Sequence, residues 1–580
     1  MTNEQELTPE PIFEGFAVKA ARPGQEAAVR EAVDRELGAG WSVRPFGDAG
    51  EGFEIVNAAA GALTPGEAWE KTYRLRTQPG VIYAEPLFAF ALSAPPESEA
   101  DAPAAAPEEA AGPESAPFGS IFGSGEPAES DDPDWSLREM NVFEAWSRFE
   151  GTGRLPGAGV VIGHPDTGYS RHPENVANLL IEEGYDFLKG DADAADELAG
   201  SSWRLEFPGH GTATASVIVS PGGAQTQYAG DPSGKAVKGV APGAKLVPLR
   251  ISKSVVLWRG SALALSHAIE YAADRGAHVI SMSLGTAVFS ERLLAAVTYA
   301  QKRGVIVLAA AGNFVRFVVW PAAFDEVIAV AASNARRGVW RHSSRGGAVD
   351  VTAPGEDVWC ARAEKTGGRA AYDVGRGSGT SFAVAATAGV AALWLSFHGR
   401  ERLVERYGAE KIPALFKDIL SRSCEPVPEW GRGKFGAGLV NAAKVLDAPL
   451  PDGVEHLMPS FGLRENEPVN AGGLATFAHL FEQSLPPAEE FASFSPGGPA
   501  PTLEGGLAEL LRVSEGELPQ QLKQVGQELA FHFITDPLLY GSFEQSLQDG
   551  LAFNEAGWVG GVRAGLMAKS ASAALKSKVS

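Results

Sequence analysis

The amino-acid sequence predicts an α/β protein whose largest domain, residues 135–447, has three layers around a mainly parallel sheet. Two observations carry this prediction. Short, strongly apolar segments recur along this part of the chain, without the polar alternation that a half-exposed strand shows. Helical segments lie between them and provide the crossovers that a parallel sheet requires.

The apolar segments are the expected strands of this sheet: GVVIGHPDTG, AKLVPLRIS, AHVISMSLG, GVIVLAAAGN and EVIAVAAS. The segments GSALALSHAIEYAADRG and SERLLAAVTYAQKRG are typical of helices, and each closes near a glycine. Ligands of such sheets bind beyond the carboxyl ends of the strands. Polar residues at those ends are therefore the candidates for chemistry.

The sequence pattern of residues 1–92 predicts a separate α+β domain. The patterns follow the order strand, helix, strand, strand, helix, strand, beginning with PIFEGFAVKA and ending with GVIYAEPLFAF. The second helical segment, TPGEAWEKTYRLRTQ, opens with a threonine cap and a proline. This order of elements is that of a ferredoxin-like split unit.

Two further regions flank the predicted sheet domain. Residues 93–134 contain eight prolines and eleven acidic residues without a lysine or arginine, so we expect a flexible linker. Residues 448–580 combine a Pro/Gly-rich piece, FSPGGPAPTLEGG, with helical stretches such as LPQQLKQVGQELAFHFI. We expect a mostly helical accessory region there, without a catalytic constellation.

Charge and cysteine content exclude several classes of protein. The formal charge of -23 argues against nucleic acid or an anionic membrane as a partner. Cys360 and Cys424 are the only cysteines, so no disulfide framework holds the fold together. We expect two buried, reduced thiols, with a single disulfide between them as the alternative.

The sequence shows neither a secretory signal nor a membrane span. The N-terminal residues are polar and acidic, and they lack the basic start and apolar core of a signal. The longest apolar run, Ser381 to Phe397, is shorter than the roughly 18 to 20 residues of a membrane span, which favours a buried helix. We therefore expect a cytoplasmic protein, with export by a non-standard route as the alternative.

Four polar residues stand where ligands of the sheet would bind. Asp166 and Asn313 each end an apolar strand, His210 begins an apolar helix, and Ser381 opens the helical run that starts with GTSFAVAATAG. Taken singly, each residue has a structural interpretation. Asp166 and Asn313 would be turn residues, His210 a capping or packed residue, and Ser381 a helix cap.

Taken together, the four residues indicate nucleophilic catalysis. A serine nucleophile needs a histidine base, and the histidine needs a carboxylate that fixes its tautomer and stabilises its charged form. A side-chain amide can donate to the oxyanion of the tetrahedral intermediate. Asp166, His210, Asn313 and Ser381 supply this set in one α/β domain.

At these residues the chain resembles the subtilisin-like serine peptidases of the S8 family, the subtilases. DTG, HGTATAS and GTSFA resemble the three catalytic signatures, and AAAGN resembles the oxyanion segment. The resemblance implies a subtilisin-like fold and a serine endopeptidase that acts through an acyl-enzyme. Asp166 would orient His210, His210 would be general base and then acid, Ser381 would attack the peptide carbonyl, and Asn313 would line the oxyanion hole.

The resemblance also implies where a protein or peptide substrate binds. Ser283, Leu284 and Gly285 would flank the substrate as an extended edge. Ala310, Ala311 and Gly312 would form the opposite wall of the primary specificity pocket. Substrate would then add as a β-strand, and the floor of the pocket stays unassigned.

The chain departs from the family pattern near two of these residues. Phe382 stands where the family usually has Met, and Ala385 and Ala386 stand where it usually has Pro, often followed by His. His164-Pro165 replaces a pair of apolar residues before Asp166. We expect effects on packing and on the pocket rim. The alternative interpretation is a catalytically silent subtilase fold that acts as a protein-binding module.

Residues 1–92 resemble the inhibitor-type propeptide of subtilases, so the N-terminal domain would inhibit its own enzyme and be cut off near residues 90–95. A permanently attached domain is the alternative. Residues 448–580 would be the region for a further protein partner. The chemistry requires no cofactor. Subtilases often bind Ca²⁺, but GYDFLKGDADAADE lacks the spacing of an EF-hand loop, so we expect a solvated acidic loop and assign no metal ligands.

Overall fold

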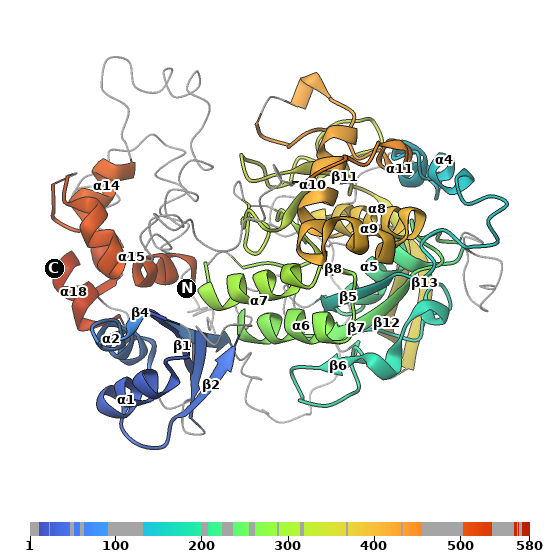
Figure 1. Ribbon diagram of the computed structural model, residues 1–580. Helices are drawn as coiled ribbons and strands as arrows, with labels where there is room; N and C mark the ends of the chain where they lie inside the picture. The colour runs from blue at the N-terminus through green and yellow to red at the C-terminus, as the bar shows by residue number, and fades with distance from the viewer. Residues whose placement is uncertain are drawn as a thin grey trace, which may run out of the picture.

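The computed structural model shows three successive parts of the chain: the N-terminal unit (residues 11–90), the central domain (131–454) and the C-terminal helices (503–580) (Figure 1). Residues 91–130, which hold most of the predicted linker and of the expected cleavage region, lie outside the described residues. The structure describes residues 11–22, 24–46, 52–57, 63–90, 131–198, 207–222, 236–253, 262–286, 289–313, 318–366, 369–430, 433–454, 503–514, 516–535, 562–564, 566–567 and 571–580.

The N-terminal unit is a four-stranded antiparallel sheet with two helices on one face. Phe53 and Ile55 of the sheet pack against Val29 and Leu75 of the helices, so a small apolar core lies between the two layers. Thr64 caps the second helix, as its sequence predicts. The elements are β1 (Pro11–Ala20), α1 (Glu26–Leu37), β2 (Ser42–Phe46), β3 (Gly52–Val56), α2 (Pro65–Arg76) and β4 (Val81–Phe90), in the sheet order β2-β3-β1-β4.

The central domain is built on a seven-stranded sheet in which each neighbouring pair is parallel. Its strands are almost entirely buried, as their apolar composition predicts. The mainly parallel sheet expected from the sequence is therefore confirmed. The strands are β5 (Val161–Asp166), β6 (Tyr185–Asp186), β7 (Lys245–Arg250), β8 (Val279–Met282), β9 (Ile306–Ala310), β10 (Ile328–Ser333) and β11 (Val351–Pro354), in the order β11-β10-β9-β8-β5-β7-β6.

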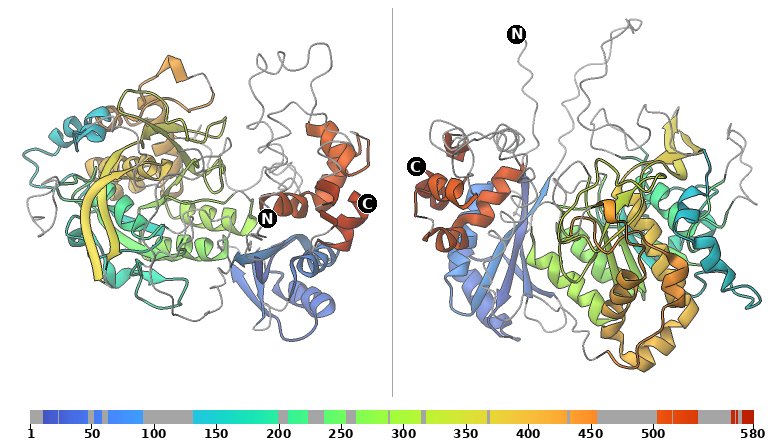
Figure 2. Two further views of the ribbon diagram at one scale, coloured as in Figure 1. Left: turned by 180° about the vertical axis from the view of Figure 1, so that it is seen from behind. Right: turned by 90° about the horizontal axis from the view of Figure 1, so that it is seen from above.

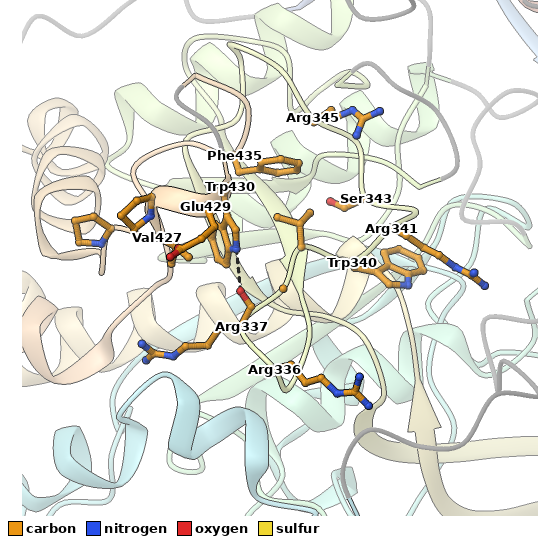
Figure 3. A pocket seen from close by; sticks show the side chains of 14 residues that line it. Arg336, Arg337, Trp340, Arg341, Ser343, Arg345, Val427, Glu429, Trp430 and Phe435 are labelled. Carbon is orange, nitrogen blue, oxygen red and sulfur yellow. Dashed lines mark hydrogen bonds between the residues drawn. The ribbon is translucent and has the colours of Figure 1, made fainter. Parts of the chain in front are cut away.

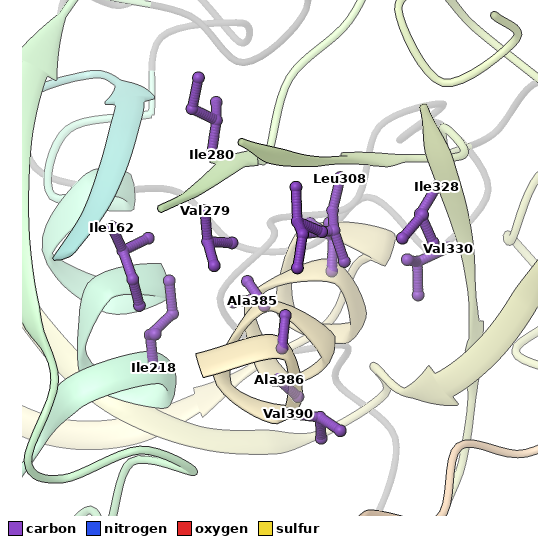
Figure 4. Packing of buried hydrophobic residues seen from close by; sticks show 14 of the residues in the cluster. Ile162, Ile218, Val279, Ile280, Leu308, Ile328, Val330, Ala385, Ala386 and Val390 are labelled. Atoms are coloured by element: carbon purple, nitrogen blue, oxygen red, sulfur yellow. The ribbon is translucent and has the colours of Figure 1, made fainter. Parts of the chain in front are cut away.

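Helices cover both faces of this sheet. Ile162 and Val279 point toward α8 (Thr380–His398), whereas Ile280 points to the opposite face (Figure 4). On that opposite face, a Cβ at Gly163 would lie 2.6 Å from the Cβ of Ala272 in α6 (Ala262–Asp274). The other elements are α3 (Trp135–Glu139), α4 (Val142–Ser147), α5 (His210–Val219), α7 (Glu291–Lys302), β12 (Val358–Thr366), β13 (Arg369–Gly377), α9 (Arg400–Tyr407), α10 (Ile412–Ser423) and α11 (Ala442–Asp447).

The central helix α8 is a core helix of 19 residues. It extends one residue beyond the apolar run at each end, so by length and composition it could cross a membrane, and the length argument made from the sequence does not hold. Burial decides the question, because 94% of its most apolar window lies inside the protein. Ala385, Ala386 and Val390 face the strands (Figure 4). Ala385 and Ala386, which stand where the family usually has Pro, often followed by His, are therefore packing residues.

The N-terminal unit contacts the central domain through a buried arginine of α7. Arg292 Nε donates to a Glu54 carboxylate oxygen of β3 at 2.6 Å. The same guanidinium makes two bonds to Glu270 of α6, at 2.8 and 2.7 Å, and it lies 4.4 Å from the centre of the Phe46 ring. Arg292 is completely buried, so this ion pair ties the two parts together away from solvent.

A second contact places a carboxylate of the N-terminal unit at the start of α7. Glu85 of β4 accepts hydrogen bonds from the Ser290 hydroxyl at 2.9 Å and from the backbone N–H of Arg292 at 3.0 Å. Ser290 is the N-cap of that helix. A carboxylate is favoured there because the first N–H groups of a helix have no partner within the helix.

The C-terminal helices lie beside the N-terminal unit, on the side away from the central domain (Figures 1 and 2). The right-hand view of Figure 2 shows the blue sheet between the red C-terminal helices and the green helices α6 and α7. The helical accessory region expected from the sequence is present in the described residues. Its helices are α14 (Leu503–Leu510), α15 (Leu518–Thr535) and α18 (Ala573–Val579).

Both cysteines are buried and free, as expected. Burial raises the pKa of the Cys360 and Cys424 thiols to about 12. Neither thiol therefore ionises near neutral pH, which makes them packing groups.

The buried His172 and the half-buried His278 lead us to predict that the fold loses stability in mild acid. Burial lowers the pKa of His172 and of His278 from 6.5 to about 4. The Nδ1 atom of His172 accepts from the Glu174 N–H, so it must stay unprotonated in the folded chain. Between pH 6.5 and 4 the unfolded chain binds more protons than the folded chain, and the free energy of unfolding falls as the pH decreases.

Denaturant unfolding at pH 6.5 and at pH 4.5, followed by circular dichroism, measures this loss. His172→Asn keeps an acceptor for the Glu174 N–H and removes one titrating group. We expect it to reduce the loss of stability between the two pH values by up to about 3 kcal/mol. An equal loss in the variant and the parent protein would contradict this account.

Candidate active site

Asp166 lies at the carboxyl end of β5 with both carboxylate oxygens occupied. One oxygen accepts from His210 Nδ1 at 2.8 Å and from the Thr167 N–H at 2.7 Å, and the other accepts from the Thr214 hydroxyl at 3.3 Å. The residue is completely buried. Burial acts to raise the pKa of Asp166, but His210, His164 and the Thr167 N–H outweigh it, and the pKa is lowered. The carboxyl group is therefore an anion beside His210.

His210 is the first residue of α5 and is oriented by Asp166. Gly209 before it has a φ of +80°, a left-handed conformation that favours glycine. Because the Asp166 carboxylate only accepts, Nδ1 of His210 carries the proton of the neutral ring, and Nε2 has a lone pair. Among the residues that the structure describes, this Nε2 has no hydrogen-bond partner. It is in the state that a general base requires.

Ser381 is the second residue of α8, and it is not the cap of that helix. The N-cap is Gly379, which makes no side-chain cap bond. The Ser381 hydroxyl donates to the backbone oxygen of Ser283 at 3.2 Å. It makes no hydrogen bond to His210 in this structure, because Nε2 of that ring has no partner among the described residues. Such bonds often tighten only when substrate is present.

The side chain of Asn313 is held beside the start of α8. Its Oδ1 accepts from the Thr380 N–H at 2.9 Å and from the Thr380 hydroxyl at 2.8 Å, which fixes the orientation of the amide. A group at the Cβ position of Gly379 would lie 3.2 Å from Asn313 Nδ2 and 3.6 Å from the Ser381 backbone nitrogen. Two donors therefore lie near one point beside Gly379, and an oxyanion hole needs two donors close to one atom.

The two expected walls of the primary pocket lie close together, and Val319 stands between them. A side chain at Gly285 would collide with Val319 Cγ2, and a Cβ at Gly312 would lie 3.2 Å from Val319 Cγ1. The Val319 N–H donates to the Ala311 oxygen at 3.0 Å, and Thr286 and Trp320 exchange two backbone hydrogen bonds. Val319 is half-buried, and its methyl groups lie against both Gly285 and Gly312.

The walls and the predicted catalytic residues are covered in this structure. Relative exposure is 0% for His210, 3% for Ser381, 1% for Ser283 and 3% for Leu284. Ala310 is also buried, at 5%. Gly312 and Asn313, however, are half-buried, so the predicted site is only partly covered.

Two contacts of Asp166 were not predicted from the sequence. Thr214, one turn into α5, places its hydroxyl against the carboxylate and also 3.1 Å from His164 Nε2. That nitrogen lies 3.7 Å from Asp166, and burial lowers the pKa of His164. The Thr214 hydroxyl has one hydrogen, for which the His210 backbone oxygen at 3.1 Å and Asp166 at 3.3 Å are both acceptors. The spacing of His210 and Thr214 on one helix face is the signal that could have revealed Thr214.

Phe382 differs from the family pattern without touching the triad atoms. It is completely buried, and a side chain at Gly377 would collide with its ring. The centre of the ring lies 6.5 Å from that of His210. Phe382 thus packs in the core beside the His210 ring.

A wide basic pocket lies near the oxyanion segment but contains none of the predicted catalytic residues (Figure 3). Its volume is about 790 Å³, and Trp340, Trp430 and Phe435 line it together with four arginines. Ser343 at its edge forms a backbone bridge with Asn313. The Trp430 indole donates to the Arg337 oxygen at 2.8 Å, as the dashed line in Figure 3 shows.

The acidic segment 184–197 uses several of its carboxylates in ion pairs. Asp186 accepts from Arg250 at 2.7 Å, and Glu197 lies 2.9 Å from Lys189. These cations and a hydrogen bond from Lys189 lower the pKa of Glu197 to about 2. In the described part of the chain, no three His, Cys, Asp or Glu side chains gather in a way that could hold a metal ion.

Comparison with known proteins identifies relatives of the central domain. A model of the "Subtilase family" matches residues 157–420. Thermitase from Thermoactinomyces vulgaris is 31% identical over 313 residues, which cover 53% of this chain and 96% of thermitase. Subtilisin BL from Lederbergia lenta is 31% identical over 225 residues, 39% of this chain and 72% of that protein.

A solved structure extends the similarity in fold. The crystal structure of fervidolysin from Fervidobacterium pennivorans, described as a keratinolytic enzyme related to subtilisin, matches with a TM-score of 0.51 at 22% identity. The match covers 78% of this chain and 63% of that chain. At this identity it supports the fold alone.

The contact between Thr214 and Asp166 predicts a positioning role that a substitution can test. Thr214→Val keeps the shape of the side chain but leaves one carboxylate oxygen without its hydroxyl donor. We expect kcat for a peptide substrate to fall by about tenfold while KM changes little.

Thr387→Val is the matched control, because that buried threonine donates only within its own helix, to the Ala383 oxygen at 2.8 Å. Equal kcat values for the two variants would rule out a special role for Thr214.

Proposed function

The chain belongs to the subtilase family and is a serine endopeptidase, and from the geometry of the site we propose that Asp166, His210 and Ser381 are its catalytic triad. The observation that carries this assignment is the 2.8 Å hydrogen bond between the buried Asp166 carboxylate and His210, with Nε2 of the same ring left unpaired among the described residues. The start of α8 then brings Ser381 to the same edge of the sheet.

In the proposed mechanism, Ser381 Oγ attacks the carbonyl carbon of the peptide bond while His210 Nε2 takes the hydroxyl proton. The resulting oxyanion accepts hydrogen bonds from Asn313 Nδ2 and the Ser381 N–H. His210 then gives its proton to the leaving amine, the C–N bond breaks, and an acyl-enzyme forms. Water, activated by the same histidine, hydrolyses this ester and restores the free serine. Subtilases perform this chemistry without a cofactor.

We assign Ser283, Leu284 and Gly285 to one side of the bound substrate, and Ala310, Ala311 and Gly312 to the other. An extended peptide would add its main chain to these edges. We propose that the intact chain is a self-inhibited precursor, which the burial of Ser283, Leu284 and Ala310 supports.

We propose that the N-terminal unit is the inhibitor in this precursor, with residues 1–92 as inhibitor, 93–134 as linker, 135–447 as peptidase and 448–580 as accessory region. Two contacts support this role. Glu85 sits at the start of α7, and Glu54 pairs with the buried Arg292. These contacts hold β3 and β4 against the central domain, and β4 leads directly into the expected cleavage region.

We further propose that the peptidase prefers a small residue before the scissile bond, because Val319 fills the floor between the two walls of the primary pocket. A small side chain fits above Val319, while a large aromatic side chain needs the space that its methyl groups occupy. The chain's own expected cleavage region, residues 90–95, offers small residues at Ala91, Ser93 and Ala94.

Removal of the nucleophile tests the central assignment. Ser381→Ala should lower peptide hydrolysis by about 10⁴-fold or more, and it should abolish self-cleavage near residues 90–95, detected by N-terminal sequencing of the fragments. A serine-reactive phosphonate should label the parent protein and fail to label His210→Ala, because the neutral serine is a poor nucleophile without its base.

Ser577→Ala, at an exposed serine outside the site, is the control for both assays. Full hydrolysis by Ser381→Ala would overturn the mechanism. Absence of labelling in the parent protein, after the N-terminal unit has been removed, would favour the catalytically silent alternative.

The pocket assignment predicts a change of specificity. Val319→Gly should raise kcat/KM for a substrate with Phe before the scissile bond, relative to one with Ala, by about tenfold or more. The ratio of the two substrates cancels any general loss of active enzyme. Val339→Gly, at a half-buried valine of the basic pocket, is the matched control. An unchanged ratio in Val319→Gly would remove Val319 from the pocket floor.

A further inference from the structure

The described residues of 503–580 make specific contacts with the N-terminal unit. The Tyr73 hydroxyl of α2 donates to Glu528 of α15 at 2.7 Å. Close to this bond, the Phe531 ring stacks on Phe88 of β4, with centroids 4.7 Å apart and an interplanar angle of 27°. Trp69 of α2 meets Phe531 at 6.1 Å in an edge-on arrangement.

A buried carboxylate organises this interface. Glu528 is completely buried, and besides Tyr73 it accepts from the N–H and the hydroxyl of Ser572, both at 2.6 Å. Ser572 caps α18, whose first turn also donates to the N-terminal unit, from the Ala574 N–H to Glu70 at 3.0 Å. Separation of the two parts would remove Glu528 from the Tyr73 hydroxyl and expose Phe531. The hydrogen bond and the stacked ring would both be lost, so the contact favours the assembled state.

The C-terminal helices and the central domain hold opposite sides of the same small unit. Phe88 and Ala84 of β4 face α1 and α2. Phe531 of α15 packs on the same side of the sheet, against Phe88. Glu85 points the other way, to the start of α7. The N-terminal unit is therefore packed between two parts that are joined to each other through residues 455–502 (Figure 2).

We propose that α15 and α18 form a retention surface for the N-terminal unit. Cutting the chain within the linker, 93–134, would leave that unit bound at two surfaces of one remaining polypeptide. Dissociation then requires both contacts to open together, because the surface that stays closed keeps the unit at a high local concentration. The accessory region would thus set how long the inhibitor stays after cleavage. The contacts alone support retention of the N-terminal unit. An effect of this retention on peptidase activity rests on the proposed inhibitory role of the unit.

The binding claim is tested in a chain that cannot cut itself. Ser381→Ala protein receives, within the linker, the recognition sequence of an unrelated site-specific protease, and that protease cuts it. The dissociation rate of the N-terminal fragment is then measured by dilution and size-exclusion chromatography. Phe531→Ala removes the stacked ring, and we expect it to speed dissociation by about tenfold.

A second variant changes a residue of the N-terminal unit at the same interface. Tyr73→Phe removes a single hydroxyl from the N-terminal unit, which leaves the fold intact, and should speed dissociation about threefold. Gln524→Ala, at an exposed position of the same helix α15, should leave the rate unchanged. Rates for Phe531→Ala and Tyr73→Phe equal to that of the parent would overturn the retention surface.

The same cut in a chain with Ser381 intact tests whether retention of the N-terminal unit delays peptidase activity. We expect peptidase activity to rise faster after the cut in Phe531→Ala than in Gln524→Ala, in step with loss of the fragment. Faster fragment loss without faster activation would uphold the retention surface and refute the inhibitory role of the N-terminal unit. The two failures are therefore distinguishable.

Discussion

The burial of α8 beneath the parallel sheet is the interaction on which the rest of the structure depends. Its alanines and valine lie against the strands, so the helix is anchored along its length (Figure 4). The first turn of the same helix carries Ser381 and the Thr380 groups that hold Asn313. A shift of this helix would therefore move the proposed nucleophile and both proposed oxyanion donors together. Ala385 and Ala386 suit that demand because small side chains allow the helix to approach the sheet closely.

The buried charge of Asp166 is the second constraint. An unpaired carboxylate at this depth would be very costly, and the chain surrounds it with His210, the Thr167 N–H and the Thr214 hydroxyl. The same contacts that make the charge tolerable also fix the tautomer of His210. Stability and catalysis thus use one set of hydrogen bonds, which is why His164 and Thr214 belong to the environment of the site although neither touches a substrate.

The N-terminal unit connects the peptidase with the C-terminal helices through its two faces. One face carries Glu54 and Glu85 toward α6 and α7, and the other carries Phe88 toward α15. Strand alternation makes this possible, because neighbouring residues of β4 point to opposite sides of the sheet. A small sheet can therefore pack against two parts at once.

The sequence by itself determined the order of strands and helices, the parallel character of the sheet and the residues that meet beyond its strand ends. These features follow from local apolar periodicity and from short segments such as DTG and GTSFA, which are readable without knowledge of distant contacts. The sequence likewise determined two smaller features, the free thiols of Cys360 and Cys424 and the helix cap at Thr64.

The tertiary structure alone decided that Val319 lies between Gly285 and Gly312, that the Ser381 hydroxyl turns to Ser283, and that Phe531 stacks on Phe88. Each of these contacts joins segments that are far apart in the chain, and no local pattern encodes which of them become neighbours. Long-range packing also decided the character of α8, because its composition allows a membrane span and only its burial shows a core helix.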